Sequence, residues 1–282
     1  MKVSVLLLAF NEEKNLPACL DALEWCDDIV LVDSGSLDRS VEVARARGVR
    51  VLQRPFDDFA GQRNWGLDHA AFRHEWVLHL DADEIVTEEF RRALDALEAG
   101  ETLDGYFVPS KMMLFGRWLK YAGSYPSYQV RLGHRDRLRF VQVGHGQREA
   151  VPPSRVGTFD VPYLHYSFSH GLFSWLNKHV RYARDEARLI LADRAAAGGS
   201  AAAGGAVGRR RAVKRLAARV PVLLRPLLRF FYVYVVRQGF RDGRAGLAYA
   251  FMLSVYEGMT AIFVLEATLG DRTAAEERPG EH

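Results

Sequence analysis

The segment Trp76-Val77-Leu78-His79-Leu80-Asp81-Ala82-Asp83-Glu84 joins an apolar run directly to a group of acidic residues. The apolar run predicts a buried strand, and the acids stand where that strand ends. In an open parallel sheet, ligands bind at the carboxyl ends of the strands. Because residues two apart in an extended chain point the same way, we expect Asp81 and Asp83 to face one ligand.

Two carboxylates that face one point are typical of a site for a hard divalent cation. Such a cation takes oxygen ligands and leaves coordination positions for phosphate oxygens. We therefore predict that Asp81 and Asp83 bind Mg²⁺ or Mn²⁺. Acidic residues that follow a strand also cap helices, so this segment alone leaves a purely structural role open.

The first hundred residues alternate apolar runs with amphipathic stretches, which predicts strands that alternate with helices. The runs are continuously apolar, as expected for strands covered on both faces. The sequence therefore predicts an α/β fold with a mostly parallel sheet flanked by helices. Helix starts are predicted at Asn11, Ser36 and Thr87, because acidic residues follow each of them. The predicted strands are Val3–Leu8, Ile29–Val32, Val49–Gln53 and Trp76–Leu80.

The pattern becomes less regular beyond residue 103. Short strands and loops are expected from about Leu103 to Tyr166, without an assigned order, and a helix is predicted over Leu172 to Ala192. Ala195–Gly208 consists almost only of Ala, Gly and Ser, which is typical of a flexible linker. Three histidines in this part have a spacing that fits no metal-ligand pattern, which predicts surface or core positions: His165, His170 and His179.

Three further segments, together with the acidic group, resemble the family-2 glycosyltransferases, whose nucleotide-sugar domain has the GT-A fold and an Asp-x-Asp motif. The segment Ser4-Val5-Leu6-Leu7-Leu8-Ala9-Phe10-Asn11-Glu12-Glu13 resembles the family's first strand and nucleotide-contacting turn. Val32-Asp33-Ser34-Gly35-Ser36 is similar to its second-strand motif, and Gly61-Gln62-Arg63-Asn64 to the helix start before the metal strand. Their order within residues 1–100 makes the combination more specific than any single segment.

The resemblance implies an enzyme that takes a sugar from a nucleotide diphosphate with the help of a divalent metal. Structural alternatives exist, because Phe10 would also suit the core, Asn11 a helix cap and Arg63 a solvated helix surface. An arginine aimed at a diphosphate can bind it in a bidentate manner. The nucleotide contacts implied are Ala9, Phe10, Asn11, Glu12, Asp33, Ser34, Arg63, Asp81 and Ala82, with Asp81 and Asp83 as metal ligands.

The second motif departs from the commonest family pattern, which has two adjacent aspartates where this chain has Asp33-Ser34. The serine variant is similar to a subgroup that includes the lipopolysaccharide-core β-glucosyltransferases. This likeness implies a lipid-linked or lipopolysaccharide-type acceptor, and UDP is the expected nucleotide because the family mostly uses it. Three more segments resemble that subgroup: Gly116-Arg117-Trp118, Tyr125-Pro126 and Gln129-x-Arg131-Leu132.

The family's usual inverting mechanism requires a general base that takes the proton from the acceptor hydroxyl. Relatives carry a His-Glu or Glu-Asp pair beyond the metal motif, and the nearest match here is His145-Gly146-Gln147-Arg148-Glu149. We predict that Glu149 is the base, with His145 as the alternative. Partial burial would raise the pKa of a glutamate toward a useful value. Glu149 could instead form a structural ion pair with Arg148 or Arg131.

Composition excludes several other classes of protein. With 282 residues, 49% of them hydrophobic, the chain can bury a full core as one large domain or as one domain plus a tail. Its two cysteines, Cys19 and Cys26, can build neither a disulfide framework nor a zinc site. The N-terminal apolar run is too short for a signal peptide, so a cytosolic setting is expected.

Positive charge is concentrated near the C-terminus, where residues 209–244 carry eleven arginines and lysines and the single acid Asp242. Two apolar stretches, Val220–Val236 and Ala245–Leu269, approach a bilayer span but contain charges that are costly at its centre. We therefore expect helices that lie in the interface, on the inner face of the cell membrane. Small residues every four positions over 246–258 predict a close helix contact. Two buried helices of a soluble domain are the alternative.

The predicted organisation is a GT-A domain over 1–192, a linker over 193–208, a basic membrane-associated helical region over 209–270 and a disordered tail over 271–282. The predicted partners are a nucleotide-sugar donor, a lipid-linked or glycan acceptor and an anionic membrane surface, with no nucleic acid. Two other functions stay open. A sugar nucleotidyltransferase would need a glycine-rich loop after the first strand, which this sequence lacks. A non-catalytic membrane or nucleic-acid binding protein would depend on the C-terminal arginines.

Overall fold

A computed structural model describes residues 1–98, 100, 102–144, 146–196 and 221–276 of the chain. The chain divides into two compact units. Unit 1 comprises Met1–Lys120 and Ser124–Ser169, and unit 2 comprises Tyr121–Gly123 and the chain from His170 onward. The helix at the end of the predicted domain over 1–192 belongs to unit 2 in this division.

Unit 1 is built on a mixed sheet with strand order β3-β2-β1-β4-β8-β6-β12-β5, while β7 and β11 pair with β6. The first four strands in this order are parallel, as predicted. The apolar residues of β1, β2 and β4 are buried on both faces, whereas those of the edge strand β3 are partly buried. The bounds are β1 Ser4–Ala9, β2 Ile29–Asp33, β3 Arg50–Gln53, β4 Trp76–Asp81, β5 Glu84–Ile85, β6 Gly105–Leu114, β7 Arg117–Trp118, β8 Ser127–His134, β11 Val156–Thr158 and β12 Tyr163–His165.

The second half of the sheet contains antiparallel strand pairs. β8 runs antiparallel to both β4 and β6, with an irregularity in the register between Tyr106 and Phe107. A separate hairpin of β9 (Phe140–Val143) and β10 (Gly146–Glu149) follows β8. The order of these elements is the part of the fold that the sequence pattern leaves unassigned.

Helices cover both faces of the sheet. One core joins the sheet to α1 (Leu16–Asp21), α2 (Ser40–Ala46) and α4 (Glu88–Ala96), and the other joins it to α3 (Phe59–His69). Thr87 caps α4 by accepting a hydrogen bond from the Phe90 backbone N–H, which confirms that predicted start. The starts predicted at Asn11 and Ser36 are wrong, since α1 and α2 begin later and both residues lie in loops.

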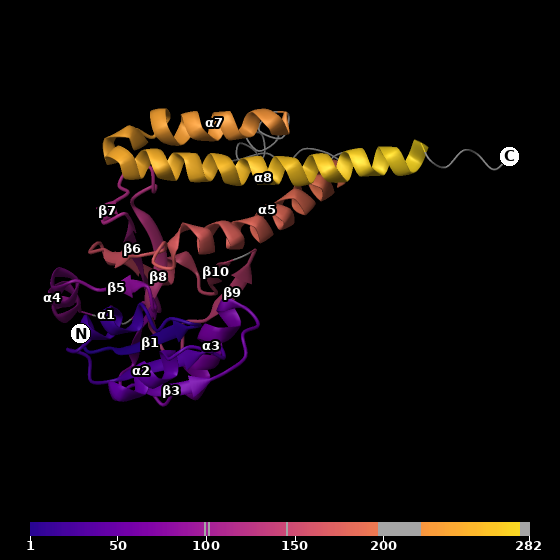
Figure 1. Ribbon diagram of the computed structural model, residues 1–282. Coiled ribbons are helices and arrows are strands. Elements are labelled where there is room, and N and C mark those ends of the chain that lie inside the picture. Colours follow the sequence, from indigo (N-terminus) through magenta and orange to yellow (C-terminus); the bar gives the residue numbers. More distant parts are fainter. Residues whose placement is uncertain (99, 101, 145, 197–220, 277–282) are drawn as a thin grey trace. The chain divides into compact units, whose positions relative to one another are not determined.

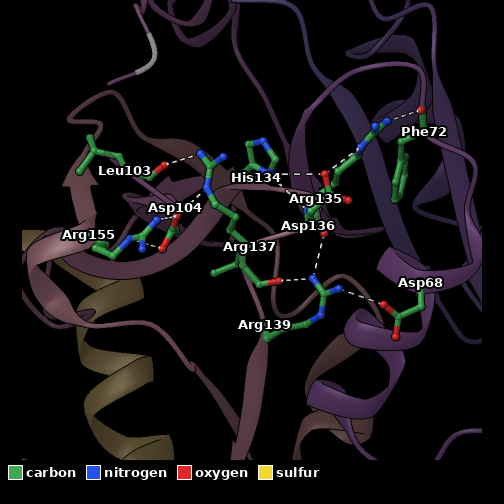
Figure 2. Close-up of polar contacts among 11 residues, drawn as sticks. Asp68, Phe72, Leu103, Asp104, His134, Arg135, Asp136, Arg137, Arg139 and Arg155 are labelled. Atoms are coloured by element: carbon green, nitrogen blue, oxygen red, sulfur yellow. Dashed lines mark hydrogen bonds and ion pairs between the residues drawn. The ribbon is translucent and has the colours of Figure 1, made fainter. Parts of the chain in front are cut away.

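Ion pairs connect strand ends at the amino end of the sheet, where the parallel strands begin (Figure 2). Buried Asp104, just before β6, accepts hydrogen bonds from Arg137 Nε at 2.7 Å and Arg155 Nη2 at 2.6 Å. Arg139 donates to Asp68 at 3.1 Å. These contacts tie the β8–β9 connection to α3 and to the start of β6, so this cluster holds strand ends together.

Unit 2 is helical. Its elements are α5 (Gly171–Ala196), α7 (Arg225–Phe231), the π-helix η3 (Tyr232–Val236) and α8 (Gly243–Glu276), with the short 3₁₀ turns η2 (Val222–Leu224) and η4 (Gly239–Asp242). Both α5 and α7 pack against α8, and Figure 1 shows α7 alongside α8. Helix α5 continues four residues into the predicted linker and α8 six residues into the predicted tail. The rest of both predicted segments lies outside the described residues.

The small-residue face of α8 contacts α7 and the turn between them. Ser254 Oγ donates to the Pro226 carbonyl at 2.8 Å, and a side chain at Gly246 would collide with the Gly239 carbonyl oxygen. This confirms the predicted close helix contact. Within the described residues, one helix, Gly239–Leu269, is long and apolar enough to cross a membrane by length and composition alone, with a mean hydropathy of 1.5.

Candidate active site

Three parallel strands of unit 1 bring the predicted site residues to one edge of the sheet. In the register, Leu8 of β1 lies beside Asp81 of β4, and Ala9 lies beside Asp33 of β2. Phe10 and Asn11 follow β1 directly, so the three predicted motifs meet at the carboxyl ends of their strands. This is the edge at which open parallel sheets bind ligands.

Two buried arginines hold the carboxylate of Asp81. Arg63 Nη2 of α3 donates to Asp81 Oδ1 at 2.7 Å, and Arg131 Nη2 of β8 donates to Asp81 Oδ2 at 3.0 Å. Both guanidinium groups are almost completely buried, whereas the carboxylate is partly exposed. Asp81, predicted as a metal ligand beside Asp83, therefore has an arginine on each oxygen.

Glu84 extends this cluster on its buried side. Its carboxylate accepts hydrogen bonds from Arg131 and, at 2.9 Å, from the Asp81 backbone N–H. Arg131 Nε also donates to the Tyr163 hydroxyl at 3.2 Å. Within the described residues, Arg63 Nε and Nη1 and Arg131 Nη1 are buried without a hydrogen-bond partner. The cluster thus keeps unused donors on both of its arginines.

The charges in the cluster shift one another's titration. Burial alone would raise the pKa of Asp81, but Arg131 and Arg63 hold it well below its usual range. Burial raises the pKa of Glu84 despite the opposing charge of Arg131. Burial and the charges of Arg63 and Arg131 also lower the pKa of His79, which lies in β4 with its ring against the Phe140 ring. His79 is therefore neutral at physiological pH.

Asp83 faces a different partner, because residues 82 and 83 form a turn between β4 and β5. Asp83 Oδ2 lies 3.5 Å from His165 Nε2. Although burial alone would lower the pKa of His165, its hydrogen bond to Asp83 and the charge of Glu84 raise it to about 9. His165 is partly buried, as a surface or core position allows, and it lies beside the acidic motif, which its spacing did not predict.

Asp83 and His165 lie where a divalent cation could bind, provided that the cation displaces the proton that His165 carries beside Asp83. A carboxylate oxygen and an imidazole nitrogen suit a transition ion such as Mn²⁺ better than Mg²⁺, which prefers oxygen ligands. The described residues contain no group of three or more His, Cys, Asp or Glu arranged to enclose a metal. Phosphate oxygens or water would have to complete the coordination, which fits an ion that binds together with a diphosphate.

The first turn of α3 ties the site loops together through the predicted Gly61–Asn64 segment. Gln62 Nε2 donates to Ser34 Oγ at 3.0 Å, and Asn64 Nδ2 donates to the Phe140 carbonyl at 2.9 Å. Arg63 stands between them and reaches Asp81. Side chains of one helical turn therefore hold the loops after β2 and β4 and the start of β9.

Loop contacts occupy several residues predicted to contact nucleotide. Asn11, in the left-handed region with φ of 57°, accepts a hydrogen bond from the Leu37 backbone N–H at 2.8 Å. Asp33 is buried and accepts from the backbone N–H groups of Gly35 and Ser36. Phe10 is exposed, so a core role is wrong for it. The Glu12 backbone N–H donates to Ser40 Oγ, while Ala9 and Ala82 are buried.

Glu149, the predicted base, lies in β10 opposite Phe140 of β9. Residues that pair across a hairpin share a face, so Glu149 is on the same side as Phe140. The Phe140 ring lies 6.0 Å from the Arg63 guanidinium carbon, which links this hairpin to the site. Arg131 binds Asp81 and Glu84, so its alternative pairing with Glu149 is wrong. His145 lies outside the described residues.

The chain matches the family model of glycosyl transferase family 2 over residues 4–147, slightly more than half of its length. It is 28% identical over 171 residues to the lipopolysaccharide core biosynthesis glycosyltransferase LpsC of Rhizobium meliloti (strain 1021), covering 56% of this chain and 60% of that protein. An uncharacterized glycosyltransferase of Rickettsia bellii (strain RML369-C) is 26% identical over 108 residues, 38% of this chain and 36% of its own. The chain thus spans less than two thirds of these relatives' lengths.

Among solved structures, glucosyl-3-phosphoglycerate synthase from Mycobacterium tuberculosis in complex with Mn²⁺, UDP and glucosyl-3-phosphoglycerate is similar with a TM-score of 0.42. The match has 19% sequence identity and covers 58% of this chain and 72% of that one, which is too distant to assign a role to any residue here. The family match begins at β1 and ends within β10, and together with the mostly parallel sheet and its flanking helices it confirms the predicted GT-A fold. The chain belongs to glycosyl transferase family 2.

Proposed function

We propose that the chain transfers a sugar from a nucleotide diphosphate, with UDP as the nucleotide, to a lipid-linked or lipopolysaccharide-type acceptor. The reaction inverts the anomeric carbon and takes place on the cytosolic face of the membrane. One observation carries the proposal: Arg63 and Arg131 lie buried behind Asp81, at the carboxyl ends of parallel strands, in a chain of this family.

Donor binding is supported by the charges at this edge. Buried guanidinium groups with unused N–H donors favour an anionic ligand, because their charge is little screened by water. Asp81 fixes both guanidinium groups at one place. Asp83 and His165 would hold the divalent cation. When bound, that ion would stabilise the negative charge of the departing diphosphate.

Proton removal from the acceptor is assigned to Glu149. The carboxylate shares the face of Phe140, whose ring contacts Arg63, and it has no role in holding Arg131. A general base must lie within reach of the acceptor hydroxyl in the bound complex. His145 is the second candidate for this role.

The acceptor class and the location are supported by one relative and by composition. LpsC is named for lipopolysaccharide core biosynthesis, and a related acceptor is proposed for this chain. The arginines and lysines of residues 209–244 support a peripheral position on an anionic membrane surface. The acceptor assignment depends on the transfer activity, whereas the membrane location does not.

The test is a thermal-shift series with nucleotide sugars, with and without Mn²⁺, since a ligand that binds only the folded state raises the melting temperature. One nucleotide sugar is expected to stabilise the chain only with Mn²⁺ present, and Asp83→Ala is expected to abolish this shift. The control is Asp95→Ala, an exposed aspartate on α4. If no nucleotide sugar shifts the wild-type chain, the proposed function is wrong.

A second variant separates binding from transfer. Glu149→Gln is expected to keep the Mn²⁺-dependent thermal shift and to lower turnover about 10²- to 10⁴-fold, the usual contribution of a general base. Turnover is measured as release of nucleoside diphosphate with the acceptor present. Near-normal turnover of Glu149→Gln would place the base elsewhere, and His145→Gln would then be measured.

A further inference from the structure

Helix α7, together with the end of η2 before it and η3 after it, carries an apolar surface that nothing in the described part of unit 2 covers. Large side chains at a spacing of three and four residues lie on one side of this helical stretch. We name it the α7 outer face, and all of its members are exposed: Leu224, Leu227, Leu228, Phe231 and Val235.

The opposite side of the same stretch packs on α8. Val222 and Val233 are buried, and the Pro226 carbonyl accepts the hydrogen bond from Ser254 of α8. The α7 outer face therefore points away from the helix that supports it. Isolated exposed leucines are ordinary in soluble proteins, but a continuous apolar face on a surface helix indicates an interaction site.

Arginines flank this face. Arg225 and Arg229 are four residues apart, one helical turn, and both are partly exposed and lie close enough to Glu257 of α8 to lower its pKa against the effect of burial. Arg237 and Arg241 follow at the end of η3 and in η4. Asp242, the acid of this stretch, is buried and accepts hydrogen bonds from the backbone N–H groups of Tyr121 and Ala122. The surface around the apolar face thus carries positive charge.

Helix α8 has the opposite charge character. Its exposed apolar residues, such as Phe251 and Ile262, are spread over a longer stretch. Between Ala245 and Leu269 the charged residues are Glu257 and Glu266, both acidic. Arg225 and Arg229 offset the charge of Glu257, and the stretch still carries net positive charge through Arg237 and Arg241, which an anionic surface would attract.

We propose that the α7 outer face docks on an anionic phospholipid bilayer, with α7 lying in the interface and α8 supporting it from behind. An amphipathic helix of this kind buries its apolar side among the acyl chains while flanking arginines reach the lipid phosphates. This deepens the membrane location proposed above and does not depend on sugar transfer.

The test is sedimentation of the full chain with vesicles of phosphatidylcholine alone and of phosphatidylcholine mixed with phosphatidylglycerol. Binding is expected to the mixed vesicles only and to weaken as salt is raised. Leu227→Asp is expected to lower the partition coefficient at least tenfold, about the effect of losing one buried leucine. The matched control is Leu37→Asp, an exposed leucine of unit 1, which is expected to bind as the wild type does.

Two more variants keep the proposal open to contradiction even if Leu227→Asp folds poorly. Arg225→Gln with Arg229→Gln retains the apolar face and is expected to weaken binding about fivefold for each arginine. Ile262→Asp changes the outer side of α8 and is expected to change binding less than twofold, a small effect on the scale of tenfold per 1.4 kcal/mol.

The proposal is overturned if Ile262→Asp weakens binding more than Leu227→Asp, because α8 would then be the inserted helix. It is also overturned if Leu227→Asp binds vesicles normally but changes the oligomeric state in sedimentation velocity. The α7 outer face would in that case contact a second copy of the chain.

Discussion

Two clusters in unit 1 each join one aspartate to two arginines, at opposite ends of the same sheet. At the carboxyl end, Asp81 is paired with Arg63 and Arg131, whose side chains are 1% and 4% exposed while the carboxylate is 32% exposed. At the amino end, where Figure 2 shows Asp104 with Arg137 and Arg155, the carboxylate is the buried partner. Asp104 is 4% exposed and its arginines, at 137 and 155, are 37% and 46% exposed.

This inversion separates a site from a structural contact. A buried carboxylate with surface arginines satisfies the carboxylate and leaves the long cationic side chains partly hydrated, which suits a fixed strand end. Buried arginines behind a partly exposed carboxylate are more costly, and both Arg63 and Arg131 retain N–H donors without partners in the described structure. Such an arrangement is suited to binding an anion, as the proposed function requires.

The largest effect is expected from Arg131→Met, which removes the donor shared by Asp81 and Glu84. The carboxylates of Asp81 and Glu84 would then remain half-buried and buried, with less positive charge beside them. The free energy of unfolding is expected to fall by about 3–5 kcal/mol, the usual result of removing one partner of a buried ion pair. Urea denaturation followed by circular dichroism measures it. A loss no larger than that of Arg155→Met would contradict the comparison.

The sequence was sufficient to predict the strands that carry this site, but not which of its side chains pair with one another. Apolar runs such as Trp76–Leu80 predict β4 because burial on both faces requires them. Period-two alternation predicted that Asp81 and Asp83 face one ligand. In the structure residues 82 and 83 form a turn, so the two carboxylates contact different partners. Local pattern cannot predict such a turn when its residues suit a strand end equally well.

Arg131, Glu84 and His165 are the site residues that sequence reasoning missed. A signal existed for two of them, since Glu84 ends the acidic segment and Arg131 stands in the Gln129-x-Arg131-Leu132 resemblance. His165 had none, because it reaches Asp83 only through the pairing of β12 with β5 and β6. Long-range strand order, which the sequence left unassigned after residue 103, decides which of these side chains meet.

An intermediate effect is expected from Asp104→Asn, the matched change at the amino end. The amide keeps the shape but loses the charge that Arg137 and Arg155 share, so the free energy of unfolding is expected to fall by about 1–3 kcal/mol. Mn²⁺-dependent stabilisation by the nucleotide sugar is expected to persist, whereas Asp81→Asn is expected to remove it. Loss of the ligand shift in Asp104→Asn would mean that both clusters serve the site.

The smallest effect is expected from Arg155→Gln, because this arginine is nearly half exposed and Arg137 still binds Asp104. The loss of unfolding free energy is expected to be about 0.2–1 kcal/mol at low salt, as for other partly exposed ion pairs. It is expected to shrink in 1 M salt, where screening acts over about 3 Å. The loss caused by Arg131→Met should change little with salt, since water and ions do not reach that guanidinium group. Equal salt dependence of the two losses would show that the exposure of the arginines does not distinguish the two ends of the sheet.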